Sequence, residues 1–347
     1  MVSASDKNHP LLFSQKCALA REILGEEKLL REACPDLTGD RSRVDLVLFK
    51  NKLGVRGPKK TSDWDFELHE DLSESLAEKW IHPQLLKNIA EIREKLPPLE
   101  FASIRIRSGM NGEKGMWIET ANELLAALLL DKKWLDSYLE KGWVIELGQN
   151  RFDKAQPINP QQWLSSVSSQ NETLPIYSRI KNFSQPGFEA NRAMILAGME
   201  LCIEEHIEGI SWAELGSGCG NLTAAYTSLW GAPRWIVESD HNVTSGLDIN
   251  ALKYFPSTLR LLGHAENLSS FDKVDLVLAD PPRSGFSSFF TQAKIQPRYI
   301  LLYSCDMRGL LKDKEALSPH YRIKKWSLVD CFPDTHFAEL VSLWEII

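Results

Sequence analysis

The chain has 347 residues, 43% of them hydrophobic and 25% charged, and its formal net charge is −7. At roughly 150 residues per domain, this length is enough for two hydrophobic cores. The acidic balance disfavours tight non-specific binding of nucleic acid, which depends on neutralising phosphates, but it allows a local basic groove. The N-terminus lacks the features of a signal peptide, and no run approaches the roughly 18 apolar residues that span a membrane.

Six cysteines are scattered along the chain without a C-x-x-C pair. This spacing indicates neither a disulfide framework nor a zinc or iron–sulfur site. We therefore expect free thiols in a cytoplasmic protein with no metal, no iron–sulfur cluster and no membrane partner.

The first half mixes short strand-like runs with helical ones. Residues 43–57 are typical of a hairpin with an Asn-Lys turn, and residues 102–120 of a second hairpin with a glycine-rich turn. Helical spacing over residues 72–96 is interrupted at Pro83. This mixture predicts an α+β domain.

Residues 156–175 are rich in Pro, Gln, Ser and Asn, so we expect a linker there. The prediction places an α+β N-terminal domain that docks RNA at residues 1–175 and a second domain at residues 176–347.

The second half alternates strand-like and helical runs up to two final apolar runs, residues 321–332 and 337–347, which have no helix between them. Such alternation predicts an α/β domain in which a parallel sheet has helices on both faces and ends in an antiparallel pair. Ligands of these sheets bind beyond the carboxyl ends of the strands.

The segment "ELGSGCGN" lies between a predicted strand and a predicted helix, with Glu214 ahead of Gly216, Gly218 and Gly220. Glycines let the backbone turn tightly and approach a ligand. The spacing differs from the G-x-G-x-x-G of dinucleotide sites, and the acidic residue favours a ligand with a positive charge, such as the amino-acid end of S-adenosylmethionine (AdoMet). Glu238 ends the next strand, where its carboxylate can accept hydrogen bonds from both ribose hydroxyls. The alternatives are a turn without a ligand and a surface glutamate.

Two further strands end in chemically distinctive residues. Asp280 opens "DPPRSG" directly after an apolar strand, and the two prolines rigidify the exit from that strand. Arg283 stands where an amino-group methyltransferase would have an aromatic residue. Cys305 follows the apolar run "YILLYS" at the mouth of another strand. The alternatives are a plain proline-rich turn and an inert buried thiol.

Taken in order, these motifs resemble those of the AdoMet-dependent RNA uracil-C5 methyltransferases over roughly residues 176–347. The resemblance implies a class I AdoMet-dependent methyltransferase domain, which is Rossmann-like with a seven-stranded sheet. The stretches that carry it are "FSQPGF", "ELGSGCGNLT", "VES…INA", "GHAENL", "DPPRSG", "YSCD" and "DCFPDTHFAEL".

The resemblance also implies AdoMet as the cofactor. The segments that resemble the family carry Asn250 and Asn267 beside the expected contacts. Those expected AdoMet contacts are Gln185, Glu214, Gly216, Gly218, Gly220, Glu238, Glu266 and Asp280.

The activity that the resemblance implies is methyl transfer to C5 of a uridine in structured RNA, either rRNA or tRNA. A thiolate of Cys305 would add to C6 and make C5 nucleophilic. Glu339 would remove the C5 proton afterwards, and Asp280 would hold the edge of the uracil ring. The target base must be flipped out of any stack to reach such a pocket. For Glu339, an exposed strand residue is the alternative.

The sequence also departs from the family pattern. Asp306 replaces the usual Asn after the cysteine and adds a negative charge beside a group that must become a thiolate. Phe337 replaces a His two positions before Glu339, with His336 one place earlier. The iron–sulfur cysteines of some family members have no counterpart here.

Basic and aromatic residues of the first half are candidates for RNA contacts through phosphates and stacking. The alternative is a solvated basic face with ordinary core aromatics. The candidates are Lys50, Lys52, Arg56, Lys59, Lys60, Arg105 and Arg107, with Trp64, Phe66 and Trp117 for stacking.

Two other functions stay open at this point, because fold alone does not fix function. The chain could methylate another base or a small molecule with Cys305 in a structural role. It could also be a non-catalytic relative that binds AdoMet and RNA.

Overall fold

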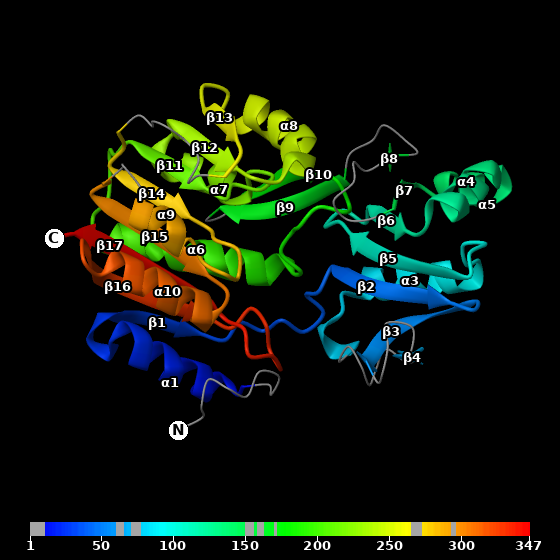
Figure 1. Ribbon diagram of the computed structural model, residues 1–347, viewed down its shortest axis with the longest axis horizontal. Helices are drawn as coiled ribbons and strands as arrows, with labels where there is room; N and C mark the ends of the chain where they lie inside the picture. The colour runs from blue at the N-terminus through cyan, green and yellow to red at the C-terminus, as the bar shows by residue number, and fades with distance from the viewer. Residues whose placement is uncertain are drawn as a thin grey trace.

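Two large β-sheets, one in each half, lie next to each other along the longest axis of the molecule, and the described residues also form a two-stranded sheet (Figure 1). The computed structural model describes residues 11–59, 66–70, 78–149, 156–157, 163–169, 172–264, 273–292 and 296–347.

The C-terminal half supplies seven strands, which are joined by β1 (Leu29–Ala33) from the N-terminus. These seven are β11 (Trp212–Leu215), β12 (Trp235–Glu238), β13 (Leu259–Leu262), β14 (Leu276–Ala279), β15 (Tyr299–Ser304), β16 (Tyr321–Val329) and β17 (Glu339–Ile346).

The strand order of this sheet is β1-β16-β17-β15-β14-β11-β12-β13. Strands β11 to β15 pair in parallel, whereas β17 runs antiparallel to both β15 and β16. The prediction of a parallel, seven-stranded sheet that ends in an antiparallel pair is confirmed. The eighth strand was not expected.

Helices cover both faces of this sheet, so that β11, β12 and β14 are buried at every position, as parallel strands usually are. One face packs against α6 (Phe188–Glu204), α7 (Asn221–Trp230) and α8 (Thr244–Tyr254). The other packs against α1 (Phe13–Leu24), α9 (Ser287–Gln292) and α10 (Met307–Leu317). This is the class I AdoMet-dependent methyltransferase fold.

The N-terminal segment belongs to the C-terminal sheet. Strand β1 pairs in parallel with β16, and α1 lies beneath it in Figure 1. The buried stripe of α1 includes Cys17, Ala20, Ile23 and Leu24, the spacing of an amphipathic helix. The division into domains near residue 175 stays a prediction, but residues 13–33 pack with the C-terminal half.

The first half forms a second sheet with the order β4-β3-β2-β5-β6-β7-β8, and helices cover part of it. Its strands are β2 (Arg43–Phe49), β3 (Lys52–Lys59), β4 (Phe66–His69), β5 (Phe101–Ser108), β6 (Lys114–Glu119), β7 (Trp143–Gly148) and β8 (Gln156–Pro157). Its helices are α3 (Pro83–Glu94), α4 (Asn122–Leu130) and α5 (Lys132–Leu139). Short 3-10 turns lie at η1 (Glu26–Lys28), η2 (Glu78–Trp80) and, in the other half, η3 (His241–Val243).

Both predicted hairpins are present. The first turns at Lys50 and Asn51, one residue earlier than expected, and both residues have positive φ angles (48° and 61°), as a two-residue type I′ turn requires. Pro83 is the first residue of α3, a position that tolerates proline.

The expected linker contains a hairpin. Strands β9 (Trp163–Ser169) and β10 (Glu172–Ser178) pair with each other in antiparallel fashion. In Figure 1 this hairpin lies between α7 and α8 on one side and β5 on the other. A composition rich in Ser and Gln concealed the strands.

The two halves are joined by specific contacts. The carboxylate of Asp40 accepts hydrogen bonds from the backbone N–H groups of Glu189 (2.8 Å) and Ala190 (3.1 Å), and so caps α6 from the first half. A Cβ at Gly187 would collide with this carboxylate, which explains the glycine. None of the described helices is long and apolar enough to cross a bilayer.

Candidate functional site

Most of the predicted site residues lie at one edge of the sheet, at the carboxyl ends of four strands and the amino end of β17. Parallel strands place their carboxyl ends at one edge of a sheet. Glu214 is the last residue but one of β11, and Glu238 is the last residue of β12. Asp280 follows β14, and Cys305 follows β15. Because β17 is antiparallel to β15, its first residue, Glu339, reaches the same edge.

Cys305 and Glu339 occupy opposing positions across the β15–β17 pair. Ser304 is paired with Leu340, and continuing this antiparallel register by one residue sets Cys305 opposite Glu339. Asp280 is close enough to both that its charge raises the pKa of each. The three predicted catalytic residues therefore lie near one another, although they are up to 59 positions apart in sequence (339 − 280).

The thiol of Cys305 is half-buried and protonated at neutral pH. Burial, followed by the carboxylates of Glu339 and Asp280, raises its pKa to about 12. The guanidinium of Arg283 acts in the opposite direction, and Asp306 raises the value further. Such a thiol reacts only when a positive charge or a base is brought to it.

Both carboxyl groups next to Cys305 are held partly neutral. Burial, followed by the charge of Asp280, raises the pKa of Glu339 to about 8. Burial, followed by the charge of Glu238, raises the pKa of Asp280 to about 7. Carboxyl groups with pKa values near neutrality are suited to proton transfer.

The glycine loop after β11 leaves one open place. Gly216, Gly218 and Gly220 all have positive φ angles (76°, 54° and 85°), which glycine adopts without strain. A Cβ at Gly216 would collide with the carbonyl oxygen of Asp280, and one at Gly220 would lie 2.9 Å from the Phe255 ring. A Cβ at Gly218 would meet nothing within 4 Å, so this glycine faces open space.

Two glutamates form hydrogen bonds near this loop, Glu238 with the loop itself and Glu214 with α7. The carboxylate of Glu238 accepts hydrogen bonds from the N–H groups of Gly218 and Asp240, both 2.7 Å long. Glu214 is buried, accepts a hydrogen bond from the Thr223 hydroxyl of α7, and has its pKa raised to about 8, mainly by burial. Its carboxyl thus links strand to helix; the predicted contact with AdoMet stays a prediction.

The structure describes two of the remaining residues from the predicted cofactor segments, Gln185 and Asn250. The amide of Gln185 lies 3.7 Å from the Met194 sulfur on α6. Asn250 bonds both the N–H and the carbonyl of Tyr177 (2.8 Å each) and the carbonyl of Cys219 (2.7 Å), so it ties the glycine loop to β10. Glu266 and Asn267 lie outside the described residues.

The loop after Asp280 is docked onto α10. The carboxylate of Asp313 accepts the N–H of Phe286 at 2.7 Å, and Gly285 has a φ of 83° with this carboxylate 2.6 Å from its Cβ position. A Cβ at Gly309 would lie 2.6 Å from the carbonyl oxygen of Arg283. The glycines allow close approach, and the sequence motif alone did not reveal their partner Asp313.

The two residues that depart from the family pattern, Asp306 and Phe337, each contact an arginine. Asp306 caps α10 by accepting the N–H of Arg308 at 2.8 Å, and the guanidinium of Arg308 donates to it at 2.7 Å. These contacts lower the pKa of Asp306 despite its burial, so it carries its charge beside Cys305. Phe337, in place of the usual histidine, packs under Arg283, whose guanidinium lies 3.9 Å from the ring centroid.

Two predicted RNA contacts were wrong. Arg107 is 3% exposed and donates to the Ser178 hydroxyl and the Arg179 carbonyl, so it fastens the first half to the segment after β10. Burial lowers its pKa to about 9. Trp117 is 4% exposed and packs in the core. Neither side chain is accessible to a phosphate or a base.

The other basic candidates are mixed. Arg105 bonds the carboxylate of Asp45 at 2.6 Å and the Lys181 carbonyl at 2.5 Å. Lys52 pairs with Glu70 at 2.6 Å on the surface. Lys60 and Trp64, and the side chains of Lys59 and Phe66, lie outside the described residues.

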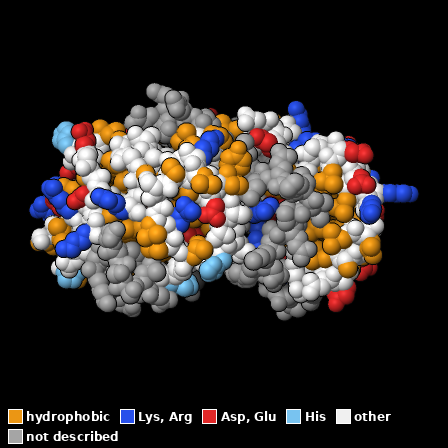
Figure 2. Space-filling view, turned by 90° about the horizontal axis from the view of Figure 1, so that it is seen from above, with side chains coloured by type: hydrophobic (Ala, Val, Ile, Leu, Met, Phe, Trp, Pro, Cys, Tyr) orange, Lys and Arg blue, Asp and Glu red, His pale blue; other side chains and the backbone are white. Residues whose placement is uncertain are grey.

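A basic surface nevertheless exists at the junction of the halves, where Figure 2 shows Lys and Arg side chains in the hollow between them. Arg43 donates to the carbonyl of Ser184 at 2.6 Å and stacks with Phe183, its guanidinium 5.3 Å from the ring centroid. Phe183 is 68% exposed, which is unusual for a large aromatic side chain.

In the part of the chain that the structure describes, no cluster of His, Cys, Asp and Glu is arranged to hold a metal.

Comparison with known proteins finds similarity to RNA methyltransferases. A family model described as tRNA (Uracil-5-)-methyltransferase matches residues 251–345. An uncharacterised RNA methyltransferase of Bdellovibrio bacteriovorus is 27% identical over 332 residues, which cover 87% of this chain and 80% of the relative. The 23S rRNA (uracil(1939)-C(5))-methyltransferase RlmD of Shewanella woodyi is 32% identical over 177 residues.

The matches differ in extent. The RlmD match covers 48% of this chain and only 38% of that relative's length. Among solved structures, the tRNA (uracil-54, C5)-methyltransferase of Pyrococcus abyssi, in complex with S-adenosyl-L-homocysteine, has a TM-score of 0.67 at 16% identity. That similarity covers 96% of this chain and 84% of the other, and it supports the fold.

Proposed function

We propose, since this chain is a relative of the AdoMet-dependent RNA uracil-C5 methyltransferases, that it transfers a methyl group to C5 of a uridine in structured RNA. The observation that carries the proposal is the meeting of Cys305, Asp280 and Glu339 at the sheet edge. Because RlmD extends well beyond the matched region, the activity, the RNA and the mechanism are all parts of this proposal.

The carboxyl edge fits AdoMet. The open space at Gly218 admits a ligand against the backbone. Glu238 stands at the end of the second strand, where its carboxylate oxygens can accept further hydrogen bonds from ribose hydroxyls. When bound, AdoMet supplies the methyl group as an electrophile. Gln185 and Asp280 border the same edge and are proposed as further contacts.

Cys305 makes C5 of uracil reactive. The thiol gives its proton to water, its sulfur forms a bond to C6, and the electrons of the C5–C6 double bond move toward the O4 carbonyl. The resulting enolate makes C5 a nucleophile. Since burial and two carboxylates oppose thiolate formation, we infer that Arg283 provides the compensating positive charge.

Glu339 completes the reaction. Once C5 carries the methyl group, its proton passes to the carboxylate of Glu339, the C5–C6 double bond reforms, and the carbon–sulfur bond breaks to release the thiolate. A pKa of about 8 makes Glu339 a stronger base than an exposed glutamate. Asp280 fixes the ring against rotation, since misplaced reacting atoms lose much of the rate.

The RNA is proposed to approach over the junction of the halves. Phe183 offers an exposed ring on which an unpaired base can stack, and Arg43 beneath it supplies positive charge. The names of the relatives include both rRNA and tRNA substrates, and both remain within the proposal. The scattered free cysteines support the cytoplasm as its location.

A trapping experiment tests the proposal. The protein is mixed with AdoMet and with RNA in which 5-fluorouridine replaces uridine. Fluorine cannot leave as a proton, so the enzyme should stall with its thiol on C6. We expect a denaturant-stable adduct whose mass includes the methyl group and which maps to Cys305.

Two variants make the experiment specific. Cys305→Ala should abolish the adduct, whereas Cys34→Ala, which removes an exposed thiol elsewhere, should leave it unchanged. If RNA and AdoMet both bind but no adduct forms, uracil-C5 methylation through Cys305 is wrong. Methylation of another acceptor or non-catalytic binding would then be the reading to pursue.

A further inference from the structure

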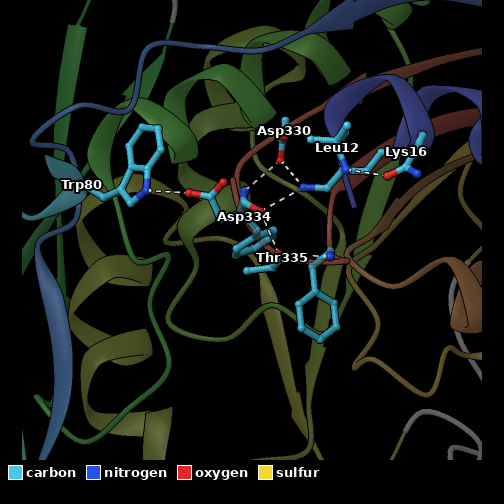
Figure 3. Close-up of polar contacts among 9 residues, drawn as sticks. Leu12, Lys16, Trp80, Asp330, Asp334 and Thr335 are labelled. Atoms are coloured by element: carbon cyan, nitrogen blue, oxygen red, sulfur yellow. Dashed lines mark hydrogen bonds and ion pairs between the residues drawn. The ribbon is translucent and has the colours of Figure 1, made fainter. Parts of the chain in front are cut away.

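The nine residues between β16 and β17, residues 330–338, form a strap that leads directly into Glu339. The strap is held from two sides by residues more than 250 positions away, as Figure 3 shows. One side is α1 and the residues just before it. The other side is Trp80 of the first half.

The contact from α1 is a buried ion pair. The ammonium of Lys16 lies 2.7 Å from the Asp330 carboxylate and 2.9 Å from the Phe332 carbonyl oxygen. Lys16 is 0% exposed, and it lies four positions before Ala20 on the buried stripe of α1. A lysine is rarely buried in this way unless its charge has a fixed partner.

The contacts nearer the middle of the strap come from both halves. The indole N–H of Trp80 donates to the Asp334 carboxylate at 3.2 Å, and the N–H of Leu11 donates to the Thr335 carbonyl at 3.3 Å. Asp334 has a φ of 59°, a conformation that costs a non-glycine residue free energy unless its surroundings hold it. The strap thus depends on outside contacts.

Inside the strap, two hydrogen bonds of Thr335 connect Phe332 to Phe337, which lies two residues before Glu339. The Thr335 hydroxyl donates to the Phe332 carbonyl at 2.7 Å and accepts the N–H of Phe337 at 3.1 Å. Phe337 in turn supports the guanidinium of Arg283. A shift of Phe332 is therefore expected to move Phe337, and with it the guanidinium of Arg283 and the start of β17 at Glu339.

We propose that Lys16 and, to a smaller degree, Trp80 are positioning residues that hold the 330–338 strap in the conformation that sets Glu339 and the Arg283–Phe337 stack beside the thiol. Neither residue is proposed to touch the substrate. The inference deepens the proposed function and rests on it, because it assigns to the N-terminal helix a part in the proton-removal half of the reaction. Docking of α1 then becomes a condition for turnover.

The test compares two substitutions on the same helix. Lys16→Met removes the ion pair but keeps much of the side-chain volume, whereas Ile23→Ala loosens the docking of α1 at its far end without touching the strap. Melting temperature identifies conditions of equal stability for the two variants. Under those conditions, hydrogen exchange of peptides covering residues 330–338 is measured by mass spectrometry, without substrate.

Turnover is measured on the same variants with ordinary uridine-containing RNA and AdoMet. We expect Lys16→Met to speed exchange of the strap about tenfold relative to Ile23→Ala. We also expect its turnover to fall roughly 100-fold, the scale of loss when a catalytic group moves by about 1 Å. Because proton removal is the slowed step, a methylated covalent adduct should accumulate in Lys16→Met and not in Ile23→Ala.

A milder variant protects the test against misfolding. Trp80→Phe removes the indole N–H and its hydrogen bond to the strap but keeps a smaller aromatic ring at this position. Like Lys16→Met, it should speed exchange of the strap and slow turnover, but only by a few-fold. It decides the question alone if Lys16→Met does not fold.

The outcomes separate this inference from the proposed function. If wild-type protein forms the 5-fluorouridine adduct but the strap exchanges equally in Lys16→Met and Ile23→Ala, the positioning role is overturned and the proposed function stands. If strap exchange differs as expected but wild-type protein forms no adduct, the proposed function fails, and with it the role in proton removal. A slower turnover without adduct accumulation also overturns that role.

Discussion

The guanidinium of Arg283 lies 3.9 Å from the centroid of the Phe337 ring. The two residues come from different loops, one after β14 and the other before β17, and Cys305 lies at the sheet edge between these loops. Arg283 lowers the pKa of Cys305, so the stack fixes a positive charge where a thiolate must form. Phe337, which stands where the family usually has a histidine, thus holds the guanidinium of Arg283 by stacking.

The stack can be tested with substitutions of Arg283. Arg283→Lys keeps the charge but loses the planar stack, and we expect adduct formation to slow by about 2- to 30-fold, the range for loss of a cation–π contact. Arg283→Met should slow it further, because the charge is lost as well. Rapid-quench measurement of adduct formation reports this step.

A second stacked arginine provides the control for this prediction. Arg298 lies 4.8 Å from the Tyr299 ring centroid, at the opposite end of β15. Arg298→Lys should leave adduct formation unchanged. Equal rates in Arg283→Lys and wild type would show that the stack has no part in activating the thiol.

Asp306 works against Cys305, and its removal should show this. Asparagine caps a helix as well as aspartate does, so Asp306→Asn should keep α10 intact while removing a charge that raises the thiol pKa. We expect iodoacetamide to modify Cys305 a few-fold faster at a given pH. Peptide mass spectrometry of the alkylated protein across a range of pH measures the effect.

Arg308→Gln gives the opposite change. Its loss removes the ion pair at 2.7 Å and leaves the Asp306 charge less compensated. Alkylation of Cys305 should therefore be slower than in wild type. If both variants alter the rate in the same direction, a change in access to the thiol explains the result better than charge does.

The sequence predicted which residues lie at the sheet edge better than it predicted the contacts that support them. The carboxyl-edge rule brings Glu238, Asp280 and Cys305 together from local strand signals alone. Glu339 was identified through the resemblance to the family, and it reaches the same edge because β17 runs antiparallel to β15. The other three residues are predictable because each lies at the end of a short apolar strand or directly after it.

The supports depend on long-range pairing that leaves no local pattern. Nothing near Lys16 points to Asp330, which lies 314 positions away; the only signal was a charged residue on an apolar helical stripe. Alternating arginines suggested a nucleic-acid surface, yet Arg107 faces inward because the segment after β10 covers it. Exposure of a strand face is decided by what packs on it, which the strand's own sequence does not state.

Gly218 should be needed for cofactor binding and not for folding. Gly218→Ala adds a methyl group into the open space beside the glycine loop and strains a φ of 54°. We expect AdoMet affinity to fall at least tenfold by isothermal titration calorimetry. The strain itself should cost about 1–2 kcal/mol of stability.

Gly209 is a matched control for this substitution. It has a similar φ of 61°, and its Cβ position also meets nothing within 4 Å, but it lies before β11 at the opposite edge of the sheet. Gly209→Ala should cost similar stability and leave AdoMet affinity unchanged. Equal affinities of the two variants would mean that AdoMet does not bind against Gly218.

The raised pKa of Glu339 predicts how stability depends on pH. The folded protein keeps a proton on this carboxyl up to about pH 8, whereas the unfolded chain loses it near the ordinary value of 4.5. Between these values the folded state binds more protons than the unfolded state, so stability falls as pH rises. Glu339→Gln removes this dependence. Its melting temperature should approach or equal the wild-type value below pH 4.5 and exceed it increasingly toward pH 8.

The gain should reach a few kcal/mol at most, because each pK unit corresponds to about 1.4 kcal/mol. Glu345 at the other end of β17 gives the reverse sign: the hydrogen bond from Arg322 lowers its pKa, so its stabilising contribution is present above its ordinary pKa and lost in acid. Glu345→Gln should therefore lower the melting temperature slightly near neutral pH. If Glu339→Gln instead destabilises the protein at pH 8, favourable contacts hold the carboxylate. The ionised Glu339 would then not lower the stability of the folded protein, contrary to this prediction.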